Sequence, residues 1–297
     1  MHLGRAYSLS EFIVWSRRQI YALLACGALP IVLYQLLGLK WLSVPLSVVV
    51  LLGTATSFIV GFKNVQTYNR ASEAQQVWTQ ILNGSRFLGV ISRDFTATPA
   101  AGRELILRHC AWLTALRYQL RSPRIWENAG KAANVEYRKH YRVPEWETPL
   151  EHALARYLPP EERERAIREA FEQQGRAERI KDYPYPRQYA VINQLFVRSF
   201  CLLLPFGILT EFEKLNSSVP GFMHSHLIWL VVPFSAMISW MYLALEQVGE
   251  STENPFEGGA NDVPIAYICR KIERELMEML GETDAVPEPA SEHGIVL

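Results

Sequence analysis

Three residues spaced four positions apart, Thr54, Phe58 and Phe62, could form a gate for ions. Residues at this spacing share one face of an α-helix, so the two phenylalanines form an aromatic ladder on that face. If several copies of such a helix surround an axis, the rings make a hydrophobic constriction that can close a pore by dewetting. The spacing alone suits a face toward lipid or a protein core at least as well, and this alternative stays open.

Small residues repeat at the same spacing on the adjacent face, as Gly53, Ser57 and Gly61. Small side chains at this interval let membrane helices approach closely, so we expect this face to pack against a neighbouring helix. The apolar sequence then changes abruptly into a polar continuation. This change adds support for a pore beyond the spacing itself; the polar residues are Lys63, Asn64, Gln66, Asn69 and Arg70.

No catalytic motif accompanies these residues. The sequence contains no G-x-S-x-G, H-E-x-x-H, P-loop or G-x-G-x-x-G pattern, its four cysteines form no C-x-x-C pair, and its histidines lack ligand spacing. The 30 Lys and Arg residues balance 30 Asp and Glu residues, which argues against a dedicated nucleic-acid surface. We therefore predict a protein that is not an enzyme, with no cofactor, metal or nucleic-acid partner.

A polar turn rich in oxygen-bearing side chains and glycine covers residues 253–262. Such a set could hold a hard cation. The alternative is a helix stop and a turn, in which Asn261 and Asp262 cap a helix predicted over 266–280. This second interpretation explains most of the same residues.

Four apolar runs would position these features, each close to the about 20 residues that span a bilayer. They cover residues 20–39, 41–62, 191–209 and 227–245. Only Lys40 separates the first two, which predicts an antiparallel hairpin. Arg198, one turn into the third run, is expected to extend toward the headgroups rather than to pair inside an assembly.

Basic residues flank one end of each run. Arg17 and Arg18 precede the first run, and Lys63 and Arg70 follow the second. By the positive-inside rule, both termini and the long middle segment should be cytoplasmic. We expect no cleavable signal peptide, because the first twenty residues carry charges and lack a small-residue cleavage site.

The predicted fold is an all-α integral membrane protein with four transmembrane helices and a helical cytoplasmic domain. The middle segment should continue the second run as a helix over 71–88 and form further helices over 103–120 and 161–174; prolines 184 and 186 make an extended link. The expected parts are an N-terminal cytoplasmic or interfacial helix (1–19), a transmembrane hairpin (20–62), the cytoplasmic domain (63–190), two transmembrane helices (191–247), a cytoplasmic turn and helix (248–281) and a disordered tail (282–297).

Several short motifs resemble the bestrophin family. SFIVGFKN at 57–64, followed by TYNR at 67–70, is similar to that family's pore-helix motif. Asn254-Pro255-Phe256 resembles its signature after the last membrane helix, and NDVP at 261–264 resembles its prokaryotic branch. The order and spacing of the apolar runs agree with the family from about Ser8 to Gly281.

This resemblance implies a homopentameric ion channel in a bacterial inner membrane, with one axial pore that passes monovalent ions. By position, Thr54, Phe58 and Phe62 would form the rings of its hydrophobic neck. The first ring is usually a larger aliphatic residue, so Thr54 would widen or wet it. A second narrowing at the cytoplasmic exit would lie near Ile180 and Tyr183.

Two departures from the family affect function. Animal members carry an acidic run that binds calcium after Asn-Pro-Phe, whereas here residues 258–261 are Gly-Gly-Ala-Asn. Asn254 and Asp262 would therefore belong to a vestigial clasp, and calcium activation is not expected. The Trp pair that commonly follows the arginine of the pore motif is replaced by Ala71 and Ser72.

The resemblance leaves the conducted ion open between two classes. Animal members pass chloride and the bacterial branch is associated with monovalent cations, so cations such as sodium are favoured and an anion channel is the alternative. A transporter or a membrane scaffold fits less well, since inverted repeats and broken helices are not evident.

Overall fold

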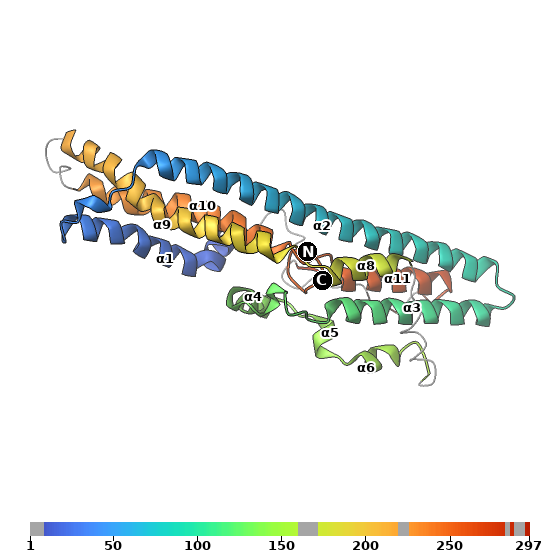
Figure 1. Cartoon of the computed structure of the whole chain (residues 1–297). Helices are drawn as coiled ribbons and strands as arrows, with labels where there is room; N and C mark the ends of the chain where they lie inside the picture. Colours follow the sequence, from blue (N-terminus) through green and yellow to red (C-terminus); the bar gives the residue numbers. More distant parts are fainter. Residues whose placement is uncertain (1–8, 160–171, 219–225, 283–285, 288–294) are drawn as a thin grey trace. The chain divides into compact units, whose positions relative to one another are not determined.

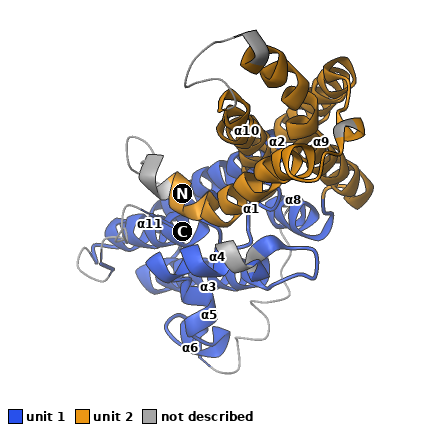
Figure 2. Ribbon diagram, turned by 90° about the vertical axis from the view of Figure 1, so that its left-hand side faces the viewer, with its two compact units in different colours: residues 1–6, 68–184, 251–297 blue, residues 7–67, 185–250 orange. Residues whose placement is uncertain are grey.

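The computed structural model describes residues 9–159, 172–218, 226–282, 286–287 and 295–297, and among these it contains helices, turns and loops but no β-strand (Figure 1). The chain divides into two compact units, shown in blue and orange in Figure 2. Unit 1 comprises residues 1–6, 68–184 and 251–297. Unit 2 comprises residues 7–67 and 185–250. The all-helical prediction is confirmed for the described residues.

Unit 2 is built from α1 (Leu9–Gln35), the first part of α2 (Leu46–Asp94), α9 (Arg187–Ser218) and α10 (Val231–Ser251). Its buried core is aliphatic and aromatic, with Val49, Val197 and Phe200 among its members. Three described helical segments are long and apolar enough to cross a membrane; they are Leu46–Asp94, Arg187–Asn216 and Leu227–Ser251. Helix α1 is not among them.

The connection between α1 and α2 is longer than Lys40 alone. Helix α1 ends at Gln35 and α2 begins at Leu46, with a short 3₁₀ helix at Lys40–Leu42 between them. Gly38 has a φ of 64°, a left-handed conformation that stops the first helix and that glycine adopts at low cost. Pro45 disfavours helix in the residue before it, which sets where α2 starts.

Unit 1 contains the rest of α2 together with α3 (Pro99–Arg121), α8 (Glu172–Asp182) and α11 (Ile265–Met279). Three shorter helices lie between α3 and α8; they are α4 (Ala132–Tyr137), α5 (Pro144–Glu147) and α6 (Leu150–Leu154). Helix α3 packs against α11, α6, α5 and α8 (Figure 1). The core includes Trp78, Leu113 and Ile272, and each such side chain contributes about 1.5–3 kcal/mol when fully buried.

The turn from α2 into α3 depends on two local features. The Thr98 hydroxyl accepts a hydrogen bond from the Ala101 amide at 3.3 Å, and Pro99 occupies the first helical position. A Cβ at Gly102 would lie 2.2 Å from the Ser92 carbonyl oxygen, so only glycine permits this close approach. The helices expected over 71–88 and 103–120 are confirmed within α2 and α3, and the helix expected over 266–280 matches α11 to one residue at each end.

Other expectations for unit 1 need correction. The expected cap by Asn261 and Asp262 is wrong: α11 begins after Pro264 with no side-chain cap, because Asp262 bonds within its own loop. The tail over 282–297 is not wholly disordered, since 295–297 are buried and the Leu297 carbonyl accepts a hydrogen bond from the Tyr267 amide at 2.6 Å. The helix predicted over 161–174 lies mostly outside the described residues, which resume at α8.

His109 on α3 predicts a pH dependence of stability. Its Nε2 lies 2.8 Å from the Ser85 hydroxyl, and its ring centre lies 5.2 Å from that of Trp112. Burial lowers the pKa of His109 from 6.5 to about 4. The folded state therefore favours neutral His109. Because the unfolded chain binds this proton more readily, the free energy of unfolding falls as pH drops below the unfolded pKa. The loss between about pH 6.5 and about pH 4 is on the order of 2–3 kcal/mol.

The measurement is the thermal unfolding midpoint of the purified protein and of His109→Gln between pH 7.5 and pH 4.5. Wild type should lose more stability than the variant over this interval. Using the difference between the two proteins removes the contribution of other titrating groups. Equal slopes would mean that His109 does not titrate as its surroundings predict.

Candidate functional site

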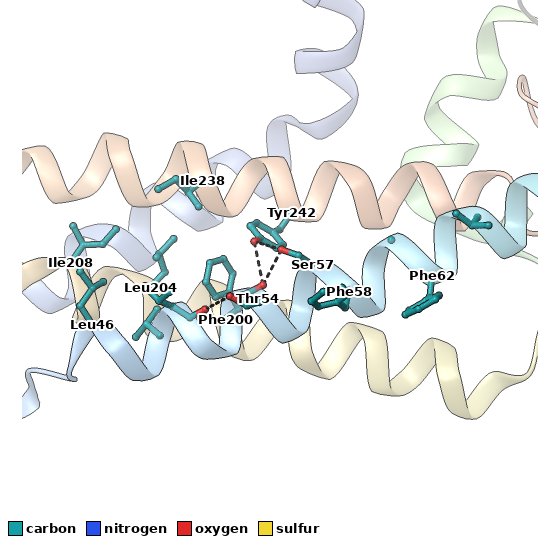
Figure 3. Close-up of a pocket in the computed structure, with 15 residues that line it drawn as sticks. Leu46, Thr54, Ser57, Phe58, Phe62, Phe200, Leu204, Ile208, Ile238 and Tyr242 are labelled. Carbon is teal, nitrogen blue, oxygen red and sulfur yellow. Dashed lines mark hydrogen bonds between the residues drawn. The ribbon is translucent and has the colours of Figure 1, made fainter.

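An apolar groove of about 800 Å³ lies in unit 2 along one face of α2 (Figure 3). The three residues of the predicted ladder, Thr54, Phe58 and Phe62, all line it. The opposite walls come from α9 and α10 through side chains such as Phe200 and Tyr242. The structure thus brings the predicted pore residues together along one groove.

The ladder side chains are largely exposed in the single chain. Phe58 is 65% exposed and Phe62 is 70% exposed, so these rings are not part of the helix core. The Thr54 hydroxyl donates to the Val50 carbonyl one turn earlier, at 2.9 Å. Thr54 therefore satisfies its donor within α2, and its remaining surface faces the groove.

The small-residue face behaves differently along its length. A Cβ at Gly53 would lie 2.7 Å from the Phe200 ring, so this glycine allows close packing against α9. Ser57 lies 2.7 Å from the Tyr242 hydroxyl on α10 and also donates to the Gly53 carbonyl at 2.9 Å (Figure 3). Gly61 has no atom within 4 Å of an added Cβ, so it packs against no other helix of the same chain, and its role in helix packing stays a prediction.

Residues on α9 that complete the groove were not predicted. Phe200, Leu204 and Ile208 form its second wall, and the ring centre of Phe200 lies 4.6 Å from that of Tyr242, with the rings tilted by 49°. Their spacing of four residues in the third apolar run is the signal that could have identified them. These side chains fix how α2 packs on α9 and α10, and so which face of α2 stays open.

The two residues predicted at the cytoplasmic exit differ in side-chain exposure. Ile180 is 4% exposed and belongs to the core of unit 1, while its carbonyl accepts a hydrogen bond from Arg70. Its side chain cannot line a passage, so this part of the prediction is corrected. Tyr183 is 71% exposed and stays a prediction.

The loop resembling a calcium clasp holds an internal cation, the Arg121 guanidinium. Arg121 contacts Asp262 at 3.2 Å, with both side chains fully buried. The same carboxylate accepts bonds from the Gly258 amide at 2.7 Å and the Gly259 amide at 3.0 Å. Asn254 donates to Glu257 at 3.4 Å, and Glu257 also accepts from the Asn128 amide at 2.8 Å.

Charged side chains of both signs are buried around this loop. The three buried carboxylates of Glu127, Glu257 and Asp262 face the cations of Lys181, which pairs with Glu127, and Arg121. Burial and the charge of Asp262 raise the pKa of Glu257. Within the part of the chain that the structure describes, no group of three or more His, Cys, Asp or Glu side chains is placed to hold a metal ion. The arrangement favours a loop whose carboxylates are paired with protein cations and amides.

A family model described as Bacterial/Fungal Bestrophin protein matches residues 13–278, most of the chain. The chain belongs to the bestrophin family. The family match spans both units, so the groove on α2 and the closed loop at 253–262 both lie within the matched part of this bestrophin.

Relatives of this bestrophin carry channel names. It is 26% identical over 276 residues to the voltage-dependent anion channel-forming protein YneE of Escherichia coli strain K12, covering 84% of this chain and 81% of that protein. It is 28% identical over 262 residues to a protein of the same description from Ralstonia nicotianae, covering 81% and 79%.

Solved structures share the fold. A single-residue mutant of a bacterial bestrophin homologue from Klebsiella pneumoniae aligns with a TM-score of 0.63 at 23% identity, covering 91% of this chain and 99% of that one. Another structure of the Klebsiella homologue gives a TM-score of 0.62 at 23% identity, covering 89% and 97%. This likeness establishes the bestrophin fold.

Proposed function

We propose that this bestrophin is an ion channel whose conducting path runs along the groove face of α2. The observation that supports this most is the exposed ladder of Phe58 and Phe62 in the 800 Å³ groove. Helices of this length and apolarity lie in a membrane, where an exposed aromatic stripe faces either lipid or a pore. The names of the relatives favour the pore.

The proposed assembly is a homopentamer in the bacterial inner membrane. Five copies would each contribute α2, so that Thr54, Phe58 and Phe62 form successive rings of an uncharged neck. Open space around Gly61 supports a neighbouring subunit as its packing partner. Helix α1 would be the fourth membrane-crossing segment, and the flanking Arg17 and Arg18 favour cytoplasmic termini.

Selectivity has two candidate answers. The resemblance to the bacterial branch favours monovalent cations such as sodium, whereas the relatives named as anion channel-forming proteins favour anions. The neck residues carry no charge, so a hydrophobic constriction of this kind does not by itself choose the sign of the ion.

The test is the reversal potential of single-channel currents from purified protein in planar bilayers under a sodium chloride gradient. A potential near the sodium limit establishes a cation channel, and one near the chloride limit an anion channel. Absence of current at every voltage would contradict the channel proposal. Native mass in detergent should match five copies of the 34.0 kDa chain; a monomer or dimer would favour a transporter or scaffold.

A further inference from the structure

A second cavity, of about 220 Å³, lies in unit 1 among residues of α3, α11 and the segment around α6. The packing of α6 and α11 against α3 places these elements around it (Figure 1). Its polar lining differs from that of the pore groove. It includes Arg117 and Tyr118 from α3, His152 and Arg156 from the α6 segment, and Arg270 and Glu273 from α11.

Three arginines from three different elements meet at this cavity, and buried carboxylates hold them in place. Arg117 pairs at 2.8 Å with Glu145, whose side chain is 1% exposed. Glu273, with a side chain 6% exposed, is shared between Arg270 at 2.9 Å and Arg156 at 3.5 Å. Among the described residues, two carboxylates therefore orient three guanidinium groups.

The tyrosine and cysteine side chains that line the cavity carry no negative charge at neutral pH. Burial raises the pKa of Tyr118 and of Tyr157, so both keep their hydroxyl protons at neutral pH. Burial also raises the pKa of the Cys110 and Cys269 thiols, which stay neutral. The cavity thus presents guanidinium cations beside neutral tyrosine and cysteine side chains.

We propose that this cavity binds a phosphate-type oxyanion, either inorganic phosphate or the phosphate group of a small monoester. Guanidinium groups match tetrahedral oxyanions with paired, charge-assisted hydrogen bonds, and orientation by buried glutamates lowers the cost of binding. The volume is several times the ~30 Å³ of one liquid water but below the ~300 Å³ typical of sites for drug-sized ligands. This excludes a large ligand such as a dinucleotide. All the lining residues belong to unit 1, so the proposal does not depend on the pore.

The experiment is a titration of the full-length protein in detergent with inorganic phosphate against chloride, at constant ionic strength. Calorimetry measures binding directly, and the thermal unfolding midpoint reports the same interaction by mass action. Wild type should bind phosphate saturably, and chloride should have no comparable effect. A parallel titration with a short-chain phosphatidate distinguishes a lipid headgroup from free phosphate as the source.

Variants locate the site. Arg156→Gln and Arg270→Gln should each weaken phosphate binding about tenfold or more, since each removes a charge-assisted bond. Arg156→Lys should recover part of the affinity, which a folding defect would not explain. Arg108→Gln is the matched control, because Arg108 lies on α3, is 51% exposed and pairs with Glu104 outside the cavity.

Two results would overturn the proposal. One is wild-type protein that shows no saturable response to phosphate or phosphatidate beyond that to chloride. The other is a loss of binding in Arg108→Gln as large as in Arg156→Gln, which would show that general surface charge, not the cavity, attracts the anion.

Discussion

Replacing Phe58 by alanine should increase the single-channel current or the open time of the reconstituted protein by about tenfold. In the proposed pentamer one substitution removes five rings from the constriction. If each ring adds only about 0.3 kcal/mol to the barrier, five add about 1.5 kcal/mol, which corresponds to about a tenfold change in rate. Since Phe58 is 65% exposed in the single chain, its removal leaves little cavity in the core.

Phe87→Ala provides a matched control for this prediction. Phe87 is the same residue type on the same helix, is 68% exposed, and does not line the groove. Its replacement should leave conduction unchanged. Currents that are identical in wild type and Phe58→Ala would mean that the exposed ladder faces lipid, and the neck would have to be sought elsewhere.

The second large effect is expected at the buried pair of Arg121 and Asp262. Arg121→Met should lower the stability of unit 1 by about 3–5 kcal/mol, because it leaves a buried carboxylate without its cation. For a chain of this size that is a fall of roughly 10 °C in the unfolding midpoint. Breaking the exposed pair of Arg103 and Glu282, whose side chains are 51% and 37% exposed, should cost less than about 1 kcal/mol.

The loss of stability should depend on pH differently for substitutions of Arg121 and of Asp262. Burial already raises the pKa of Asp262, and without the guanidinium that pKa rises further. The carboxyl then takes up a proton as pH falls, so Arg121→Met should be less destabilising at pH 5 than at pH 8. Asp262→Asn instead leaves a buried guanidinium that cannot lose its proton, and its cost should not be relieved at low pH. Equal pH profiles for the two variants would contradict this account.

The long helices of this protein could be predicted from its sequence, because their signals are local. Helix α2 contains no proline from Leu46 to Asp94, and α11 alternates apolar and charged residues with helical period. The short helices α4, α5 and α6 gave no such signal. Their residues are held by tertiary contacts, as when the Arg138 guanidinium lies 4.6 Å from the centre of the Trp146 ring.

The part of the candidate site that lies on one face of one helix could be predicted from the sequence. Thr54, Phe58 and Phe62 share a face by spacing alone, and all three line the groove. Sequence spacing does not show which residues a second element will cover, because that depends on tertiary packing. Ile180 is buried because α8 packs against α3, and Asp262 serves a distant arginine in place of the nearby helix end.

The hydroxyl of Thr54 has a consequence for an ion that has lost its water. Since its hydrogen is committed to the Val50 carbonyl, the oxygen can offer only lone pairs to the groove. A ring of such oxygens can replace part of the hydration shell of a cation but has no proton to donate to chloride. Thr54→Val should therefore reduce sodium permeation more than chloride permeation, and an equal reduction of both would show that the hydroxyl turns toward the ion.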